Sequence, residues 1–422
     1  MKETVSAGEA KTSQLPGSNR LVEVVRLFLR LGFTAFGGPV AHIAMMRQEV
    51  VQRRAWLSDD SFVDLLGIIN LIPGPNSTQL AIYLGYLRAG PAGLIAAGVC
   101  FIGPAMLIVM TLAWLYVSYG TLPEVGGLLY GIKAIVIAII AQALWGLCRT
   151  VLKGPLPIIL ALIVMLLYLL GVNGLLLFAG AGLFFGLVRW TERGQRERKK
   201  GRQKTLSLAF PLLPGGLYGL PNTWYRFAAQ GIPEAMLAAT PVSLLTLFLT
   251  FLKIGATLYG SGYVILAFLR GDFVQGLGWL NERQLLDAIS IGQFTPGPVF
   301  TTATFIGYLV KGWQGALVAT LGIFLPSFLL IAIIHPLAGT LRRTFWTAAI
   351  LDGINIAALA LMCGVLLQLG QNALLGQSLL LNVVAGLIAL VSLLVLLRFK
   401  INSVWLIIAG GALGLAVWWV WH

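Results

Sequence analysis

Residues 70–79 read NLIPGPNSTQ, and residues 293–302 read QFTPGPVFTT. Both stretches lie inside apolar runs that are long enough to reach the middle of a bilayer. A proline at that depth removes a backbone hydrogen-bond donor and breaks the helix. Freed backbone groups are tolerated there only where they are buried in protein or line a cavity. Two such breaks at matching positions of two halves therefore indicate the binding site of a transporter.

The composition is that of a polytopic membrane protein. Of the 422 residues, 58% are hydrophobic and only 10% are charged, and the mean hydropathy is +0.89. A soluble globular domain carries about 25% charged residues. Apolar runs of about 20 residues recur along the chain, which predicts an all-α fold of membrane-spanning helices embedded in a lipid bilayer.

The net charge of +14 follows from Lys and Arg in loops. Cytoplasmic loops collect such residues, so we expect no nucleic-acid partner. The densest run, 189–204, holds eight Lys or Arg residues and is interpreted as part of a cytoplasmic linker that can contact anionic lipid. Three cysteines without CxxC spacing indicate neither a metal site nor a disulfide framework, and no cofactor is expected.

The two halves of the chain are copies of each other. Residues 28–34 (FLRLGFT) align with residues 251–257 (FLKIGAT) at an offset of 223. After the Pro-Gly-Pro the offset becomes 222. Further matches pair Trp56 with Trp279, Asp64 with Asp287, Pro73 with Pro296, and Pro104 with Pro326. We therefore predict one fold built from two homologous repeats.

The predicted organisation has four parts. Residues 1–20 lack the apolar run of a signal peptide and form a cytoplasmic tail. Residues 21–188 and 238–421 are the two repeats. Residues 189–237 are a basic linker, within which 205–221 is the one candidate for an extra membrane crossing, although it carries three prolines.

Charge distribution favours re-entrant segments and inverted halves. If the first two apolar segments turn back at their Gly/Pro breaks, the Lys and Arg groups of the first half fall on one side of the membrane. The positive groups of the second half reach the same side only if that half is inverted. The alternatives are first segments that cross the membrane completely and halves that run parallel.

Two motifs carry a family resemblance. One is Phe-Gly-Gly-Pro at 36–39 followed by Ala-His at 41–42. The other is the Pro-Gly-Pro with Gly-Tyr-Leu at 85–87, and degenerate copies of both recur in the second half. Over about 21–420 the chain resembles the chromate transporter (CHR) family in its long, two-domain form. The resemblance implies that the chain exports chromate across a bacterial inner membrane, driven by the membrane potential or the proton gradient, and confers chromate resistance.

Chromate is a tetrahedral dianion, so a site within the bilayer needs converging donors. A helix that restarts after Pro-Gly-Pro offers free N–H groups and the positive end of its dipole. We expect the second proline of each motif in the first helical turn. The alternative is that these residues only cap the helix. The candidate substrate-binding residues at these breaks are Pro73, Gly74, Pro75, Asn76, Ser77, Thr78, Gln79, Pro296, Gly297, Pro298, Thr301 and Thr302.

The earlier break of each half supplies further candidates. Glycine there permits close approach of a ligand or of another helix. The residues are Gly37, Gly38 and Thr34 in the first half and Gly260, Ser261 and Thr257 in the second. Arg30 and Lys253 occupy equivalent positions inside apolar sequence and are expected to attract the anion. Snorkelling to the interface is the alternative, above all for Arg30.

Five residues are candidates for proton or charge coupling: Asp64, Asp287, Lys133, Asp352 and His42. A carboxylate near a broken helix can carry the coupled proton. Asp64 and Asp287 can equally cap a helix or pair with Arg54 or Arg283. Lys133 and Asp352 lie at matching levels of the two halves and are expected to pair across the repeat axis.

Two other functions compete with chromate export. The same machine can move another anion, such as sulfate. An intramembrane serine/lysine hydrolase is the alternative from another class, because Lys253 lies eight residues before Ser261. The sequence lacks the HExxH motif and the Walker Gly-Lys-Ser/Thr, which argues against a metalloprotease and an ATP-driven pump. A homodimer is the expected assembly.

Overall fold

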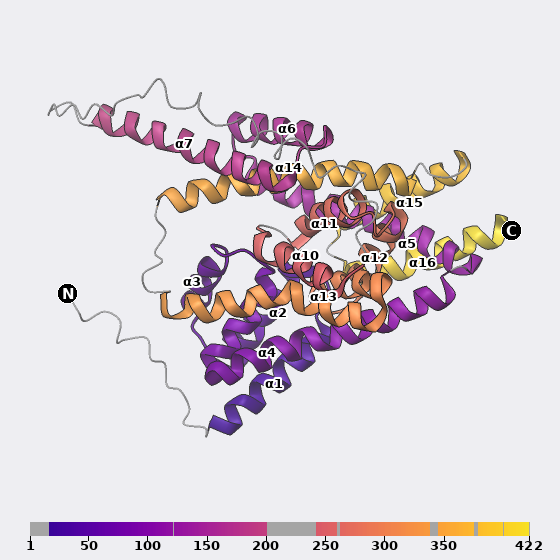
Figure 1. Ribbon diagram of the computed structural model, residues 1–422, viewed down its shortest axis with the longest axis horizontal. Coiled ribbons are helices and arrows are strands. Elements are labelled where there is room, and N and C mark those ends of the chain that lie inside the picture. The colour runs from indigo at the N-terminus through magenta and orange to yellow at the C-terminus, as the bar shows by residue number, and fades with distance from the viewer. Residues whose placement is uncertain are drawn as a thin grey trace.

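The computed structural model describes residues 17–120, 122–200, 242–259, 262–337, 345–374, 379–399 and 401–421. Every regular element in these ranges is a helix, and seven of the described helices are long and apolar enough to cross a membrane. The prediction of an all-α polytopic membrane protein is therefore confirmed (Figure 1). The tail up to residue 16, the linker from residue 201 with its candidate crossing at 205–221, and Gly260 and Ser261 lie outside the described residues.

Two broken helical hairpins open the first half. Their elements are α1 (Gly17–Thr34), α2 (Gly38–Arg47), the π-helix η2 (Gln48–Arg53), α3 (Asp59–Ile69) and α4 (Asn76–Tyr119). The Arg88 guanidinium, at the end of the second hairpin, lies 2.7 Å from Glu23 near the start of α1. It also lies over the ring of Trp56, between the hairpins. Both hairpins thus begin and end at the same level and are re-entrant, as predicted.

α4 contains two helices that fold back on each other. At Gly90 the chain has φ +63°, which favours glycine, and reverses direction. The two parts pack so closely that a Cβ on Gly85 would overlap the backbone of Gly93. α13 (Thr302–Leu337) repeats the turn at Gly312. The second part of α4, from residue 91, is therefore the first helix that is long and apolar enough to cross a membrane.

The second half repeats this order of elements. They are α10 (Leu244–Thr257), η3 (Gly262–Val264), α11 (Ile265–Leu269), η4 (Arg270–Gly276), α12 (Glu282–Phe294), η5 (Val299–Thr301) and α13. Helix capping repeats as well. The Ser58 side chain caps α3, and Asn281, 223 residues later, caps α12. The duplication read from the sequence is therefore also a structural duplication.

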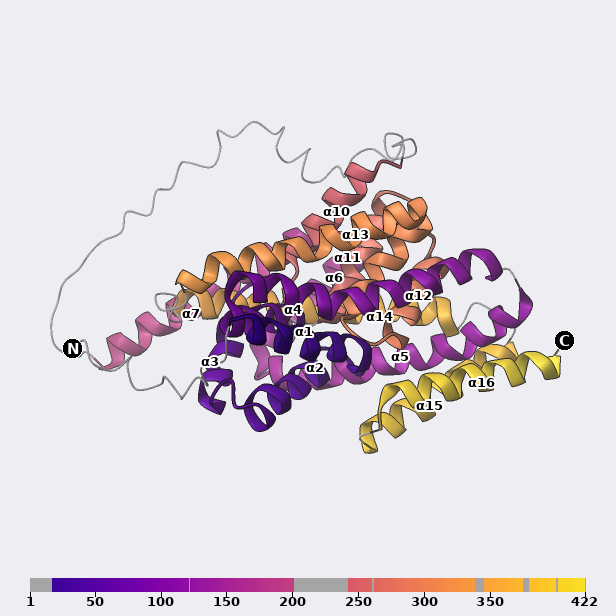
Figure 2. The same cartoon turned by 90° about the horizontal axis from the view of Figure 1, so that it is seen from below.

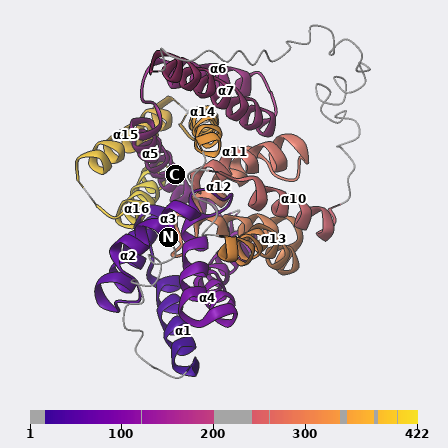
Figure 3. The ribbon, with the colours of Figure 1, turned by 90° about the vertical axis from the view of Figure 1, so that its left-hand side faces the viewer.

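The last three helices of each half are exchanged between the halves. These helices are α5 (Pro123–Val151), α6 (Pro155–Leu169) and α7 (Gly174–Lys200), and then α14 (Phe345–Leu374), α15 (Leu379–Arg398) and α16 (Ser403–Trp421). α5 packs against α15 and α16, whereas α14 packs against α6 and α7. Figure 3 shows the two groups on either side of the α5–α14 contact, and Figure 2 shows α15 and α16 alongside α5. The halves therefore interlock.

Glycine lines the tightest of these contacts. Gly127 and Gly131 of α5 face Gly410 and Gly414 of α16, and a Cβ on Gly131 would overlap the backbone of Gly410. Small residues allow such close helix packing in membranes, where van der Waals contact rather than water exclusion drives association. α7 continues to Lys200 and so includes the first part of the predicted basic linker.

Contacts between the halves show that the second half is inverted. We call the level of Arg88, Arg149 and Arg189 the basic end and the opposite level the far end. His335, close to the end of α13, packs against Tyr83 in the hairpin that returns to the basic end. Asp352, early in α14, lies 3.2 Å from Arg189. α13 thus ends, and α14 begins, at the basic end, whereas α4 ends and α5 begins at the far end.

Candidate functional site

The four breaks meet where the two halves touch. The Gly74 N–H donates to the Leu258 carbonyl over 2.7 Å, and the Gly297 N–H donates to the Ala35 carbonyl over 2.8 Å. Gly74 and Gly297 are equivalent in the two repeats, and so are Ala35 and Leu258, at the offset of 223. Each Pro-Gly-Pro therefore docks on the first break of the other half. This reciprocal contact satisfies backbone that the broken helices leave free.

Each Pro-Gly-Pro glycine is required by its conformation and by its neighbours. Gly74 has φ +124° and Gly297 has φ +87°, both in the region that favours glycine. A Cβ on Gly74 would lie 3.1 Å from the Ser327 hydroxyl, and a Cβ on Gly297 would lie 2.7 Å from the Ala105 Cβ. Ser327 was not among the site residues predicted from the sequence. The only available signal was a serine directly after Pro326 in an apolar run.

Polar side chains surround the first Pro-Gly-Pro. The Gln79 amide donates to the Pro73 carbonyl over 2.5 Å, and the Asn76 amide donates to the Asn70 side chain over 2.8 Å. Both side chains thus stabilise the broken backbone. Each side chain lies at the break, but in this state its N–H group donates to an oxygen of the protein itself.

Two buried hydroxyls at the same break have no such partner. Within the part of the chain that the structure describes, the hydroxyls of Thr78 and Ser327 are buried without a hydrogen-bond partner. Ser77 beside them is buried as well. Buried polar groups in proteins are normally paired, so an unpaired one is explained by a ligand, a water molecule or a function. These two hydroxyls are therefore hydrogen-bonding groups that the described part of the protein leaves unused at this break.

The second Pro-Gly-Pro is satisfied by its own side chains. The Thr301 hydroxyl donates to the Pro298 carbonyl and the Thr302 hydroxyl to the Val299 carbonyl, each over 2.8 Å. For these two hydroxyls the alternative to substrate binding therefore applies, because they cap the broken backbone. The expectation that the second prolines lie in the first helical turn was wrong by one position. Pro75 and Pro298 are N-caps, and a helix begins at the next residue.

The first breaks also face each other. A side chain on Gly38 would contact the Tyr263 hydroxyl, and one on Gly262 would contact Pro39. Gly37 caps α2 with φ +102°. The glycines thus serve close packing between the halves. The threonines before these breaks are occupied: Thr34 and Thr257 each donate to the carbonyl four residues earlier, over 2.7 Å.

His42 lies at the reciprocal contact itself. Its Nε2 is 3.1 Å from the Ala35 carbonyl, which also accepts the Gly297 N–H. The ring is buried edge-on against Phe101, and its Nδ1 has no hydrogen-bond partner among the described residues. His42 thus places a titratable ring directly behind the break.

Ion pairs repeat between the halves. Arg30 lies 2.5 Å from Glu49, and the equivalent Lys253 lies 2.5 Å from Asp272. Arg47–Asp59 and Arg270–Glu282 form a second matched set, at 2.5 and 2.6 Å. Arg30 and Lys253 therefore each have a carboxylate partner rather than pointing directly at a break.

The predicted pair between Lys133 and Asp352 was wrong. Lys133 Nζ lies 2.7 Å from Oδ1 of Asp287, and the Tyr116 hydroxyl donates to Oδ2 over 2.9 Å. Asp352 pairs with Arg189 instead. The reason is the interlocking of the halves, because α12 packs between α4 and α5 and brings Asp287 to Lys133.

The equivalent carboxylates Asp64 and Asp287 differ in burial and in their partners. Asp287 is fully buried, whereas the equivalent Asp64 is exposed. Asp287 pairs with Lys133 rather than with Arg283, and Arg54 pairs with Glu49 rather than with Asp64. A cavity of about 750 Å³ opens above the buried pair at the far end, and Lys133, Tyr130, Asn281, Glu282 and Arg283 are among its lining residues. A buried carboxylate with an ion-pair partner therefore occurs at this position in the second half and not in the first.

Comparison with known proteins agrees with this architecture. The family model for the chromate transporter matches residues 22–187 and 245–415, one segment in each repeat. The chain belongs to the chromate transporter family. This family transports chromate and is not a family of enzymes, so the hydrolase alternative is dropped.

Curated relatives extend over most of the chain. The chromate transport protein of Cupriavidus metallidurans is 33% identical, over 97% of this chain and 96% of its own. The probable chromate transport protein of Synechococcus elongatus is 32% identical, over 88% and 89%. The chromate transport protein of Pseudomonas aeruginosa is 29% identical, over 86% and 85%. No solved structure matches the chain.

Proposed function

We propose that this chromate transporter is a secondary active exporter that moves chromate from the cytoplasm across the bacterial inner membrane and so confers chromate resistance. The observation that carries the proposal is the reciprocal contact of Gly74 with Leu258 and of Gly297 with Ala35. It supports a substrate site near the centre of the membrane, where broken helices of inverted repeats meet in transporters. The buried hydroxyls of Thr78 and Ser327 are donors for the anion there.

The basic end faces the cytoplasm in this proposal, because cytoplasmic ends collect Lys and Arg. The far end, with its cavity above Lys133, then faces outward. Asp287 and Lys133 are proposed to couple charge movement to export, because Asp287 is fully buried and joins the two halves. His42, behind the break, is a second candidate for the coupled proton.

The test is chromate flux into energised inside-out membrane vesicles, with sulfate as competitor. Gly74→Ala is the test variant, because its Cβ would meet Ser327 and its φ is strained for any other residue. Gly67→Ala is the matched control, because nothing lies within 4 Å of a Cβ there. We expect uptake in wild type and Gly67→Ala, and uptake at least about ten-fold lower in Gly74→Ala, as for a misplaced site.

Three outcomes of this flux measurement would contradict parts of the proposal. Normal flux in an inserted, folded Gly74→Ala variant would contradict the assignment of the site to the paired breaks. Flux of sulfate but not of chromate through folded wild type would move the function to another anion. Chromate uptake that survives collapse of both the membrane potential and the proton gradient would exclude secondary active export.

A further inference from the structure

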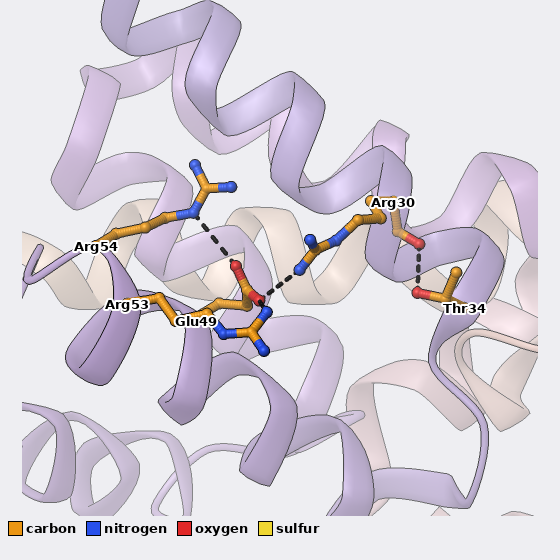
Figure 4. Close-up of polar contacts among 5 residues, drawn as sticks. All are labelled: Arg30, Thr34, Glu49, Arg53 and Arg54. Carbon is orange, nitrogen blue, oxygen red and sulfur yellow. Dashed lines mark hydrogen bonds and ion pairs between the residues drawn. The ribbon is translucent and has the colours of Figure 1, made fainter.

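Three arginines converge on one carboxylate at the basic end. Figure 4 shows the guanidiniums of Arg30, Arg53 and Arg54 around Glu49. Arg30 reaches across from α1, Arg53 is the last residue of η2, and Arg54 follows it. The distances to the Glu49 oxygens are 2.5 Å from Arg30, 2.7 Å from Arg53 and 3.4 Å from Arg54. Glu49 supplies one negative charge against three positive charges, so the cluster keeps an excess of two.

The surplus charge is accessible. The Glu49 side chain is only 6% exposed, whereas the arginines are 50%, 57% and 30% exposed in the order Arg30, Arg53, Arg54. A guanidinium has five N–H donors, and one buried carboxylate cannot accept all those of three arginines. Donors and positive charge are therefore left over on the side of the arginines that faces away from Glu49.

The cluster leads from the surface toward the substrate break. Arg54 lies over the ring of Trp56, and Arg88 lies over the same ring, which places Arg54 at the basic end. Arg30 lies at the other end of the cluster, one helical turn before Thr34 and the break that follows it. Long side chains of a helix lean toward its N-terminus, so Arg30 spans the depth between the break and the basic end.

Among the described residues of the inverted half, no such cluster occurs at the equivalent place. The equivalents of Arg30 and Glu49 form a simple pair, Lys253–Asp272. The positions equivalent to Arg53 and Arg54 are Gly276 and Leu277. The cluster around Glu49 thus carries two more positive charges than the equivalent Lys253–Asp272 pair. Helix packing shared by both repeats does not account for a feature that one repeat lacks.

We propose that Arg30, Arg53 and Arg54, held together by Glu49, form an anion-capture site that collects a tetrahedral dianion at the basic end and passes it toward the paired breaks. The inference rests on the proposed function for the identity of the transported anion. The surplus of two positive charges matches a dianion. A positive mouth raises the local concentration of anions and the rate of capture, and its effect falls steeply with ionic strength.

The experiment measures KM and maximal rate for chromate in inside-out vesicles. In Arg53→Gln/Arg54→Gln we expect KM to rise about ten-fold at low ionic strength, with a maximal rate within about two-fold of wild type. At 0.5 M salt the KM difference should shrink to within about two-fold, because charges are then screened. Arg53→Lys/Arg54→Lys should restore KM, because it restores the charge.

A matched control removes a neighbouring ion pair without changing the net charge. Arg47→Gln/Asp59→Asn lies at the same end, where both partners are half-exposed. We expect its KM to equal that of wild type. A glutamine variant with unchanged KM, while wild type transports chromate, would overturn the capture site and leave the proposed function intact. An absence of chromate flux in folded wild type would instead overturn the proposed function.

Lipid phosphate groups have the same oxyanion chemistry as the substrate, so a separate experiment must distinguish the two. The variants are compared in liposomes of phosphatidylcholine alone and with added phosphatidylglycerol. A capture site for the transported anion predicts the KM defect in both. A defect that occurs only with phosphatidylglycerol would assign the arginines to lipid headgroups and overturn the proposal.

Discussion

At the scale of single residues, equivalent positions of the two repeats differ in burial and in their charged partners. Asp64 and Asp287 occupy the same place in the two repeats, yet only Asp287 is buried, with Lys133 and Tyr116 as its partners. Burying even a complete ion pair costs desolvation energy, which the attraction between the two partners repays only when their geometry is very good. The asymmetry is therefore maintained at a cost in stability, which favours a functional role for the Lys133–Asp287 pair.

Asp287→Asn should destabilise the protein far more than Asp64→Asn. It leaves Lys133 without its counter-ion, and removal of one partner from a buried pair costs about 3–5 kcal/mol. We expect a lower melting temperature in detergent and loss of chromate flux for Asp287→Asn, and values near wild type for Asp64→Asn. The double variant Lys133→Met/Asp287→Leu should recover much of the melting temperature but not the flux. Recovery of flux in that double variant would show that the pair is only structural.

At the scale of elements, the last three helices of each half pack mainly against helices of the other half. α5 packs against α15 and α16 of the other half, and α14 packs against α6 and α7. The glycines of α5 and α16 allow these two helices to approach at backbone distance. The stability of the central site therefore depends on helices that contribute no residue to it.

Gly131→Leu should separate α5 from α16. Its Cβ would already overlap the Gly410 backbone, whereas Gly146 on the same helix has nothing within 4 Å of a Cβ. Overpacking of a tight contact costs about 1–3 kcal/mol or more. We expect a lower melting temperature for Gly131→Leu and little change for Gly146→Leu, measured by thermal aggregation in detergent. Equal melting temperatures for the two variants would argue against the exchanged packing of the helices.

At the scale of the whole molecule, inversion gives the two ends of the protein different surface chemistry. The cluster around Glu49 lies at the basic end, and the cavity above Lys133 lies at the far end. The pseudo-symmetric scaffold thus has unequal ends, because the cluster of three arginines occurs in only one of the two matching hairpins that the structure describes.

Inversion can be tested by labelling two equivalent positions. Asp60 and Arg283 are 223 residues apart and both exposed, at the mouths of the matching hairpins. Asp60→Cys and Arg283→Cys are made in a background in which Cys100, Cys148 and Cys363 are Ser. A membrane-impermeant maleimide applied to right-side-out vesicles should label Arg283→Cys alone, and inside-out vesicles should reverse the result. Labelling of both from one side would contradict the inverted arrangement.

The sequence by itself determined the class, the duplication and the breaks. Hydropathy shows which segments prefer lipid, and Pro-Gly-Pro interrupts a helix wherever it occurs, so these features need no knowledge of distant contacts. Tertiary structure decided the partners. Ser327 lies at the first Pro-Gly-Pro because α13 packs against α4. Lys133 pairs with Asp287 instead of Asp352 because α12 packs against α5. A buried charge or hydroxyl takes the partner that packing brings to it, and equivalence in the sequence does not reveal that neighbour.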